Sequence, residues 1–511
     1  ADSTASFVSE NALDASTGTV TFNTNGPKPT WSSTGGQGGS GQLVTTSYTD
    51  ASQNTITYTV AKYDFDRINI GDGASVTLTG TNPIFINVAG DATILADLDA
   101  NGSDGTNAAG VQLGKLGGGY GGHKWNSATW GAGSGPSHLL SADSFQSAGA
   151  PFKGWGNLDA TTFTGGQEPG GGSYGGVGGR PEAVGGQAQF DTLGAFGKVY
   201  GDADLTNLFG GSGGGGGNER QGGSGAGAIK IVSTGTLTIG GDIWACGGKG
   251  GARSNEARRS GGSGSGGSIY LKAANLVINS GVQIRANGGA GATGINSGNS
   301  YVKDGGGAGP AAGGGGRVYV EATTSLVNNA SSTNANVSAT GGQSQAASGT
   351  PRHGTDGSVK ILRPQVSELV FTSGSLTIDT TLGTILHSDG SFMAGTLVDK
   401  TYTFDGANYP YKICVFTADR INIGSNVIVN LQGANALSLR TRNHGDLNIG
   451  AQLLANGENA SEPTSNTGIG GVAKLGGWNG ADHDGNGNGP GGGQSKVDNN
   501  DGAGAGYGNH G

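Results

Sequence analysis

Apolar and polar residues alternate in short stretches along this chain, and the stretches recur at regular distances. Between residues 228 and 251 three apolar pairs follow one another: Ile229/Ile231, Leu237/Ile239 and Ile243/Ala245. Alternation with a period of two predicts β-strands that bury one face and expose the other. This stretch therefore predicts three short strands joined by turns, after which the chain enters a glycine-rich excursion.

The same unit recurs downstream. Its first pair is found again as Ile269/Leu271, Val318/Val320 and Val359/Ile361, at successive distances of 40, 49 and 41 residues. Two apolar residues per strand cannot stabilise an isolated hairpin, but equivalent strands about 4.8 Å apart can stack into a shared apolar column. We therefore predict an all-β fold of the β-solenoid class, similar to a parallel β-helix. Its structural core is expected to contain Ile229, Ile231, Leu237, Ile239, Ile243, Ile269, Leu271, Leu276, Ile278, Ile284, Val318, Val320, Val359 and Ile361.

A longer repeat spans several of these units. The hexapeptide DRINIG occurs at 66–71 and again at 419–424, an offset of 353 residues, so the chain holds one long repeat and the beginning of a second. Together the two scales predict an organisation into N-terminal strands or a cap (1–60), a first repeat head (61–122), an aromatic and glycine-rich insertion (123–208), regular solenoid units (209–362), inter-repeat strands (363–415) and a partial second repeat (416–511).

Glycine accounts for 109 of the 511 residues. It disfavours helices by about 1 kcal/mol per position, so long helices are not expected. The glycine tracts have two interpretations. They are either flexible surface loops or ordered, polyglycine-II-like segments that pack side by side and bond main chain to main chain, because glycine lets backbones approach closely.

The formal net charge is −9 and no basic stripe is present, so we expect no nucleic-acid partner. No apolar run approaches the length of a membrane-spanning helix. The first residues, ADSTASF, fit the mature end left by cleavage of a signal peptide, which favours a secreted or cell-surface protein. Cys246 and Cys414 are interpreted as small buried residues, with a disulfide as the alternative.

Candidate chemistry is sparse. Asp97, Asp99, Asn101 and Asp104 are spaced like the start of an EF-hand loop, but Ala108 stands where the bidentate glutamate is needed. They form either a calcium site or an ordinary turn, and no other cofactor is expected. The segment with Asp482, Asp484 and Asn486 offers the same two choices.

Two further clusters contain residue types that act in carbohydrate chemistry. Asp64, Asp66, Arg67 and Asp72 form the nearest cluster of carboxylates with a cation; the second copy keeps Asp419 and Arg420, which favours a structural ion pair at a turn. The second cluster is aromatic and either stacks on sugar rings or packs on the flank of the fold: Trp125, Trp130, Phe152 and Trp155.

The units written GGSGxGGSIYLKAxxLxIxxGVxIRANGG resemble the glycine-rich β-helical repeats of large bacterial surface proteins, adhesins and extracellular matrix fibres. The resemblance covers 228–362, and 60–120 and 415–480 through the long repeat. It implies an exported structural or adhesive protein. The sparse candidate chemistry predicts that the protein is not an enzyme, and the partial second copy predicts that it forms or belongs to an extracellular filament by end-to-end stacking. Its partners would be further copies or a continuation of the same chain, and surface polysaccharide. The alternative is a β-helix protein that binds or cleaves carbohydrate; an ice- or surface-binding array would need a flat threonine lattice that the sequence lacks.

Overall fold

The computed structural model divides into two compact units, which are described separately. Unit 1 comprises residues 1–324 and 328–362, and unit 2 comprises residues 325–327 and 363–511. Every helix or strand assigned in the described part of the chain is a β-strand. The structure describes residues 11–49, 55–108, 110–122, 133–135, 170–179, 199–217, 220–252, 260–291, 311–331, 334–344, 353–404, 407–442, 445–456, 475 and 477.

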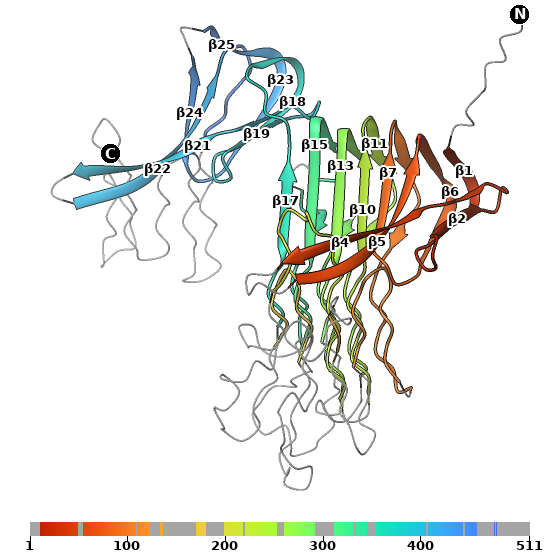
Figure 1. Cartoon of the computed structure of the whole chain (residues 1–511). Helices are drawn as coiled ribbons and strands as arrows, with labels where there is room; N and C mark the ends of the chain where they lie inside the picture. Colours follow the sequence, from red (N-terminus) through yellow and green to blue (C-terminus); the bar gives the residue numbers. More distant parts are fainter. Residues whose placement is uncertain are drawn as a thin grey trace, which may run out of the picture. The chain divides into compact units, whose positions relative to one another are not determined.

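Unit 1 is built around a mixed 13-stranded sheet that nearly closes into a barrel (Figure 1). One arm runs β3-β2-β1-β6-β8-β11 and the other β4-β5-β7-β10. The two arms meet at β13, whose first half pairs with β10 and whose second half pairs with β11, and β15 and β17 follow. The strands are β1 (Ala12–Asn23), β2 (Thr30–Ser33), β3 (Gly38–Ser40), β4 (Gln42–Thr49), β5 (Thr55–Phe65), β6 (Arg67–Thr79), β7 (Ile84–Val88), β8 (Ala92–Ile94), β10 (Ala228–Ser233), β11 (Thr236–Ile239), β13 (Ser268–Ile278), β15 (Arg317–Asn328) and β17 (Ser358–Leu362).

The all-β prediction is confirmed, but the predicted fold class, a parallel β-solenoid, is wrong. Antiparallel hairpins open unit 1, in β1-β2-β3 and in β4-β5, and the sheet that they begin is mixed and curls back on itself. The reason for the error is physical. Alternation along a strand reports that one face is buried, but it says nothing about the direction of the neighbouring strand or about closure of the sheet.

Within this sheet, equivalent apolar residues of successive repeats are direct neighbours. Ile229 of β10 lies between Ile84 and Ile269, and Leu237 of β11 pairs with Leu276 on one side. A second, four-stranded parallel sheet is formed by β9 (Leu98–Asp99), β12 (Ile243–Trp244), β14 (Ile284–Arg285) and β16 (Val337–Ser338). Each buried aliphatic side chain contributes roughly 1.5–3 kcal/mol, so these columns stabilise strands too short to persist alone.

The glycine tracts that lead into or out of these strands, together with those between them, form what we call the glycine layer: residues 100–105, 117–122, 210–217, 220–227, 245–252, 260–267, 286–291 and 311–316. Most of its glycines are buried, and their amides donate to carbonyls of other tracts. Of the two interpretations that the sequence left open, the described tracts therefore adopt the ordered one.

Hydrogen bonds run in three directions from the tract 222–227 in the glycine layer. In the tract 222–227 every third residue donates to the same neighbour, at N···O distances of 2.8–3.1 Å: Gly222 and Gly225 to Gly122 and Gly119, Gly223 and Ala226 to Gly262 and Ser265, and Ser224 and Gly227 to Ser103 and Ala100. A left-handed extended helix has three residues per turn and no internal hydrogen bonds. Its amides therefore point to three sides, which a flat sheet cannot do.

Close packing explains why these positions are glycine. A Cβ on Gly223 would lie 2.1 Å from the carbonyl oxygen of Gly248, and one on Gly264 would lie 2.0 Å from that of Ser224. Real side chains do not approach backbone atoms so closely, so the neighbouring tract would have to move. The layer thus depends on the absence of side chains.

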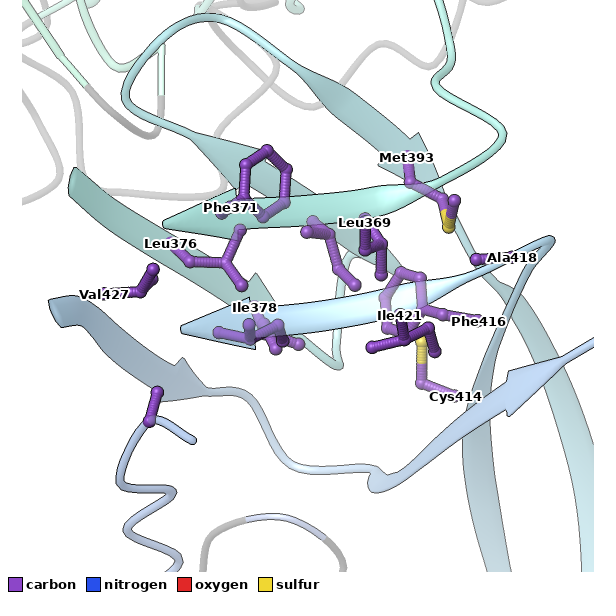
Figure 2. Close-up of a cluster of buried hydrophobic side chains, with 13 residues drawn as sticks. Leu369, Phe371, Leu376, Ile378, Met393, Cys414, Phe416, Ala418, Ile421 and Val427 are labelled. Atoms are coloured by element: carbon purple, nitrogen blue, oxygen red, sulfur yellow. The ribbon is translucent and has the colours of Figure 1, made fainter. Parts of the chain in front are cut away.

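Unit 2 is a half-barrel of two sheets. One contains β18 (Leu369–Asp379), β19 (Thr384–His387), β20 (Phe392–Ala394), β23 (Ile421–Gln432) and β25 (Leu447–Ile449), and the other contains β21 (Thr396–Phe404), β22 (Ala407–Ala418) and β24 (Ala436–Thr441). Figure 2 shows the buried cluster that this unit encloses, with Leu369, Phe371 and Leu376 from β18 and Cys414 and Phe416 from β22. Its two sheets are thus held together by side chains.

Replacing Gly223 by alanine is expected to loosen the glycine layer. The new methyl group overlaps the Gly248 carbonyl, and overpacking of this kind typically costs about 1–3 kcal/mol. We expect faster amide hydrogen exchange in 247–252 and 260–267 and a lower unfolding temperature of unit 1. Gly35→Ala is the matched control, because a Cβ there finds its nearest heavy atom at 3.7 Å. Equal exchange in the two variants would contradict the steric account.

Candidate functional site

The four residues of the candidate calcium site connect neighbouring segments of the chain. The Oδ1 atoms of Asp97, Asn101 and Asp104 each accept a backbone N–H at 2.8 Å, from residues 242, 246 and 249 respectively. Asp99 accepts the amide of Asn101 and lies 3.4 Å from the Lys115 ammonium. Side-chain oxygens here extend the backbone pairing. No group of three or more metal-binding side chains is found among the described residues.

The acidic cluster around Arg67 lies along β5, β6 and the residue that joins them, and its members have different partners. Asp66 accepts the backbone N–H of Asn11 at 2.7 Å, and Arg67 forms an ion pair with Asp14 on the neighbouring β1 at 2.9 Å. In unit 2, Arg420 likewise pairs with Glu368 at 2.9 Å. The arginines thus join parallel strands.

The remaining carboxylates of this cluster lie apart from each other. Asp64 pairs with Lys62 at 2.7 Å and accepts hydrogen bonds from Asn87 and Gln42. Partial burial alone would raise the pKa of Asp64, but these hydrogen bonds outweigh it and hold the pKa below its usual value. Asp72 is exposed on β6. The structure does not bring these groups together around a common point.

A row of lysine and aromatic side chains crosses the unit 1 sheet, and the sequence analysis did not identify it. The row comprises Lys62, Phe85, Lys230, Tyr270, Tyr319 and Lys360, which occupy equivalent positions on β5, β7, β10, β13, β15 and β17. The Lys230 ammonium lies 5.0 Å from the Phe85 ring centre and 4.4 Å from that of Tyr270. The Tyr270 and Tyr319 rings stack at 4.9 Å with planes 4° apart. The row can be recognised in the sequence, because each of its residues stands between two apolar residues of one strand, as Lys230 does between Ile229 and Ile231.

The stacked tyrosines continue into a buried aromatic cluster that includes Tyr58, Tyr174, Leu205, Leu208 and Phe209. Within it, the Tyr174 hydroxyl lies 2.7 Å from that of Ser268, and the Tyr58 hydroxyl accepts the backbone N–H of Leu208 at 3.1 Å. A shallow hollow adjoins the cluster and is lined by Asp202, Ala203, Asp204, Thr206 and Lys360.

Burial shapes the ionisation of this region. It raises the pKa of Tyr58, Tyr174 and Tyr270 to about 12 in each case. Burial, together with the nearby charge of Lys272, also lowers the pKa of Lys230. The neutral forms of these groups are favoured because a low-dielectric surrounding penalises charge. The half-buried Phe85, held between Lys62 and Lys230, is the most accessible ring of the row.

Twelve of the fourteen residues predicted for the core are buried. The prediction is wrong for Val359, whose side chain is 43% exposed, and Ile361 is only half-buried. Both lie on β17, the last strand after β15, so in the described residues no further strand covers their free edge. Cys246 and Cys414 are free thiols, and Cys414 is buried whereas Cys246 is half-buried.

Several predicted residues lie outside the described residues. They are the aromatic residues Trp125, Trp130, Phe152 and Trp155, and the acidic group Asp482, Asp484 and Asn486. No helix in the described part of the chain is long and apolar enough to cross a membrane. No protein-family model, no curated protein and no solved structure matches this chain.

Substitutions at Asn101 distinguish a calcium site from an ordinary turn in the acidic segment. Asn101→Ala removes the acceptor of the Cys246 amide, and we expect unit 1 to lose about 1 kcal/mol of stability in urea unfolding. Asn101→Asp keeps the acceptor and should stay close to the parent. Neither protein should respond to calcium or to a chelator. A calcium-dependent rise in the unfolding midpoint, larger in Asn101→Asp, would show instead that the segment binds the ion.

The buried tyrosines predict a late alkaline transition. Their folded pKa of about 12 exceeds the unfolded value near 10, so the stability that they contribute is complete below pH 10 and is lost as the pH rises toward 12. We expect the absorbance at 295 nm to show these tyrosines ionising above pH 11, together with loss of near-ultraviolet circular dichroism. Titration of all tyrosines near pH 10 with the fold intact would contradict the assignment.

Proposed function

We propose that the protein is an exported structural or adhesive protein of an extracellular fibre or surface layer, in which the glycine layer is a stiff spacer. The observation that carries this proposal is the threefold bonding of the tract 222–227 to three neighbouring tracts. Bonds in three directions resist bending and shear on every side, whereas a single sheet resists them mainly within its plane. Buried main chain also offers proteases little extended substrate.

The strands of unit 1 support the same proposal of a stiff spacer. Long-range main-chain pairing and aliphatic columns anchor each glycine tract at a fixed position in the unit 1 sheet. The bridges from Asp97, Asn101 and Asp104 tie the start of one tract to the start of another. A spacer of this construction keeps whatever it carries at a fixed distance from its anchor.

Force spectroscopy and electron microscopy test the proposed role. We expect a distinct high-force event for the glycine layer in single-molecule pulling, and a lower force for Gly223→Val than for Gly35→Ala, because valine enlarges the overlap with Gly248. We also expect concentrated protein to appear as ordered assemblies or surface coats. Release of reducing sugars from polysaccharides, lost on Asp66→Asn or Asp99→Asn, would overturn the proposal in favour of an enzyme.

A second candidate function is polysaccharide binding at the lysine–aromatic row. It is favoured by Phe85, a half-buried ring flanked by Lys62, Lys230 and the polar side chains of Asp64 and Asn87. Sugar rings stack on aromatic faces while neighbouring polar groups bind their hydroxyls.

Affinity electrophoresis in gels with neutral or acidic polysaccharides tests this candidate. Retardation that Phe85→Ala abolishes, and that Tyr402→Ala at a 50% exposed ring of unit 2 does not, is the expected result. Equal mobility of all three proteins in every gel would exclude binding at the row.

A further inference from the structure

The eight strands of unit 2 pair in the same pattern as the first eight strands of unit 1. β18 pairs with β19 and β19 with β20 through antiparallel hairpins, and β18 pairs with β23 in parallel. In the same way β1 pairs with β2, β2 with β3, and β1 in parallel with β6. Both parallel pairs carry an irregularity near their start, between Ala15 and Thr17 and between Phe371 and Ser373. The hairpin β21-β22 with β24 corresponds to β4-β5 with β7, and β23-β25 corresponds to β6-β8.

The correspondence extends to single residues. Equivalent register pairs are Ala61↔Ile84 with Cys414↔Leu437, and Ile70↔Ile94 with Ile423↔Ile449. Even the turn that follows is repeated: Leu116 and Leu475 both have a φ of 51°, and their amides donate to Gly80 and Gly433. Unit 2 is therefore a second copy of the same strand framework, and unit 1 shows what lies beside that framework.

In unit 1 the strand–turn–strand segment β10–β11 covers the outer edges of β7 and β8. Ile229 and Ile231 pair with Ile84 and Ile86, and Leu237 pairs with Ala92. In the described part of unit 2 the equivalent strands β24 and β25 end their sheets. Among the residues that the structure describes, two parallel edges that are covered in unit 1 are thus uncovered in unit 2.

Side chains on the uncovered edges of unit 2 are more exposed than their equivalents in unit 1. Ala92 of β8 is 1% exposed, whereas its equivalent on β25, Leu447, is 50% exposed. Ile84 and Ile86 are buried, but their equivalents Leu437 and Leu439 are only half-buried. An uncovered edge that also leaves apolar side chains in water is a site for pairing with another strand.

We propose that unit 2 binds, in parallel along β24 and β25, a strand–turn–strand segment with the sequence pattern of β10–β11. Such a segment carries two apolar residues at alternate positions, a short polar turn, and two more, as in AIKIVSTGTLTI. Its first pair covers Leu437 and Leu439, and its second pair covers Leu447 and Ile449. The inference concerns unit 2 alone and does not depend on the proposed role of the glycine layer.

A synthetic peptide of residues 226–247, with Cys246→Ser and a fluorescent label at its N-terminus, is the probe. Added to the full chain, it should raise the anisotropy in a saturable way, whereas a scrambled peptide of the same composition should not. Leu447→Asp should weaken binding about tenfold, as expected for loss of one buried leucine contact. Leu382→Asp, at a 66% exposed leucine in the turn before β19, is the matched control and should bind like the parent.

Disulfide cross-linking tests the register. In unit 1 Thr238 pairs with Thr93, whose equivalent in unit 2 is Asn448. A Thr238→Cys peptide should cross-link to Asn448→Cys in a chain that also carries Cys246→Ser. It should not link to Asn422→Cys, which lies one strand further in on β23. Absence of saturable binding, equal binding of the scrambled peptide, or preferential linkage to position 422 would each overturn the inference.

Discussion

Main-chain hydrogen bonding between segments far apart in sequence is the interaction on which this molecule depends. It joins parallel strands in the barrel of unit 1, and it joins glycine tracts in three directions in the glycine layer. A backbone group buried without a partner costs as much as a lost hydrogen bond, so each tract can be buried only where another tract meets it. The tracts therefore stabilise one another, and none is expected to keep its form alone.

The strands and the glycine layer of unit 1 exclude water in different ways. The strands bury aliphatic side chains such as Ile229 and Ile269 in columns, whereas the tracts bury backbone and exclude side chains, as Gly223 and Gly248 show. Near the point where a strand ends and a glycine tract begins, side-chain oxygens of Asp97, Asn101 and Asp104 accept backbone hydrogen bonds from the neighbouring segment. Acidic residues that resemble ion ligands in sequence thus serve as additional acceptors for backbone amides.

Unit 2 shows the same strand framework in a different surrounding. Residues equivalent by register, such as Ala92 and Leu447, differ in exposure because the neighbours of their strands differ. A strand's burial is therefore a property of the stack around it as much as of its own sequence. A repeated framework therefore offers further edges to which strands can be added.

The pattern of apolar residues along the chain is sufficient to predict many of the strands, the repeats and most of the core. Alternation marks Ile229 and Ile231 as one buried face, and the offset of 353 residues relates the two copies of DRINIG whatever the fold. Three features depend on tertiary contacts that this pattern does not contain. Hairpins open unit 1, β13 joins two arms of the sheet into a nearly closed barrel, and Lys230 lies between Phe85 and Tyr270. Alternation is a local property of one strand, whereas strand direction, closure and the meeting of side chains on different strands depend on partners distant in the chain.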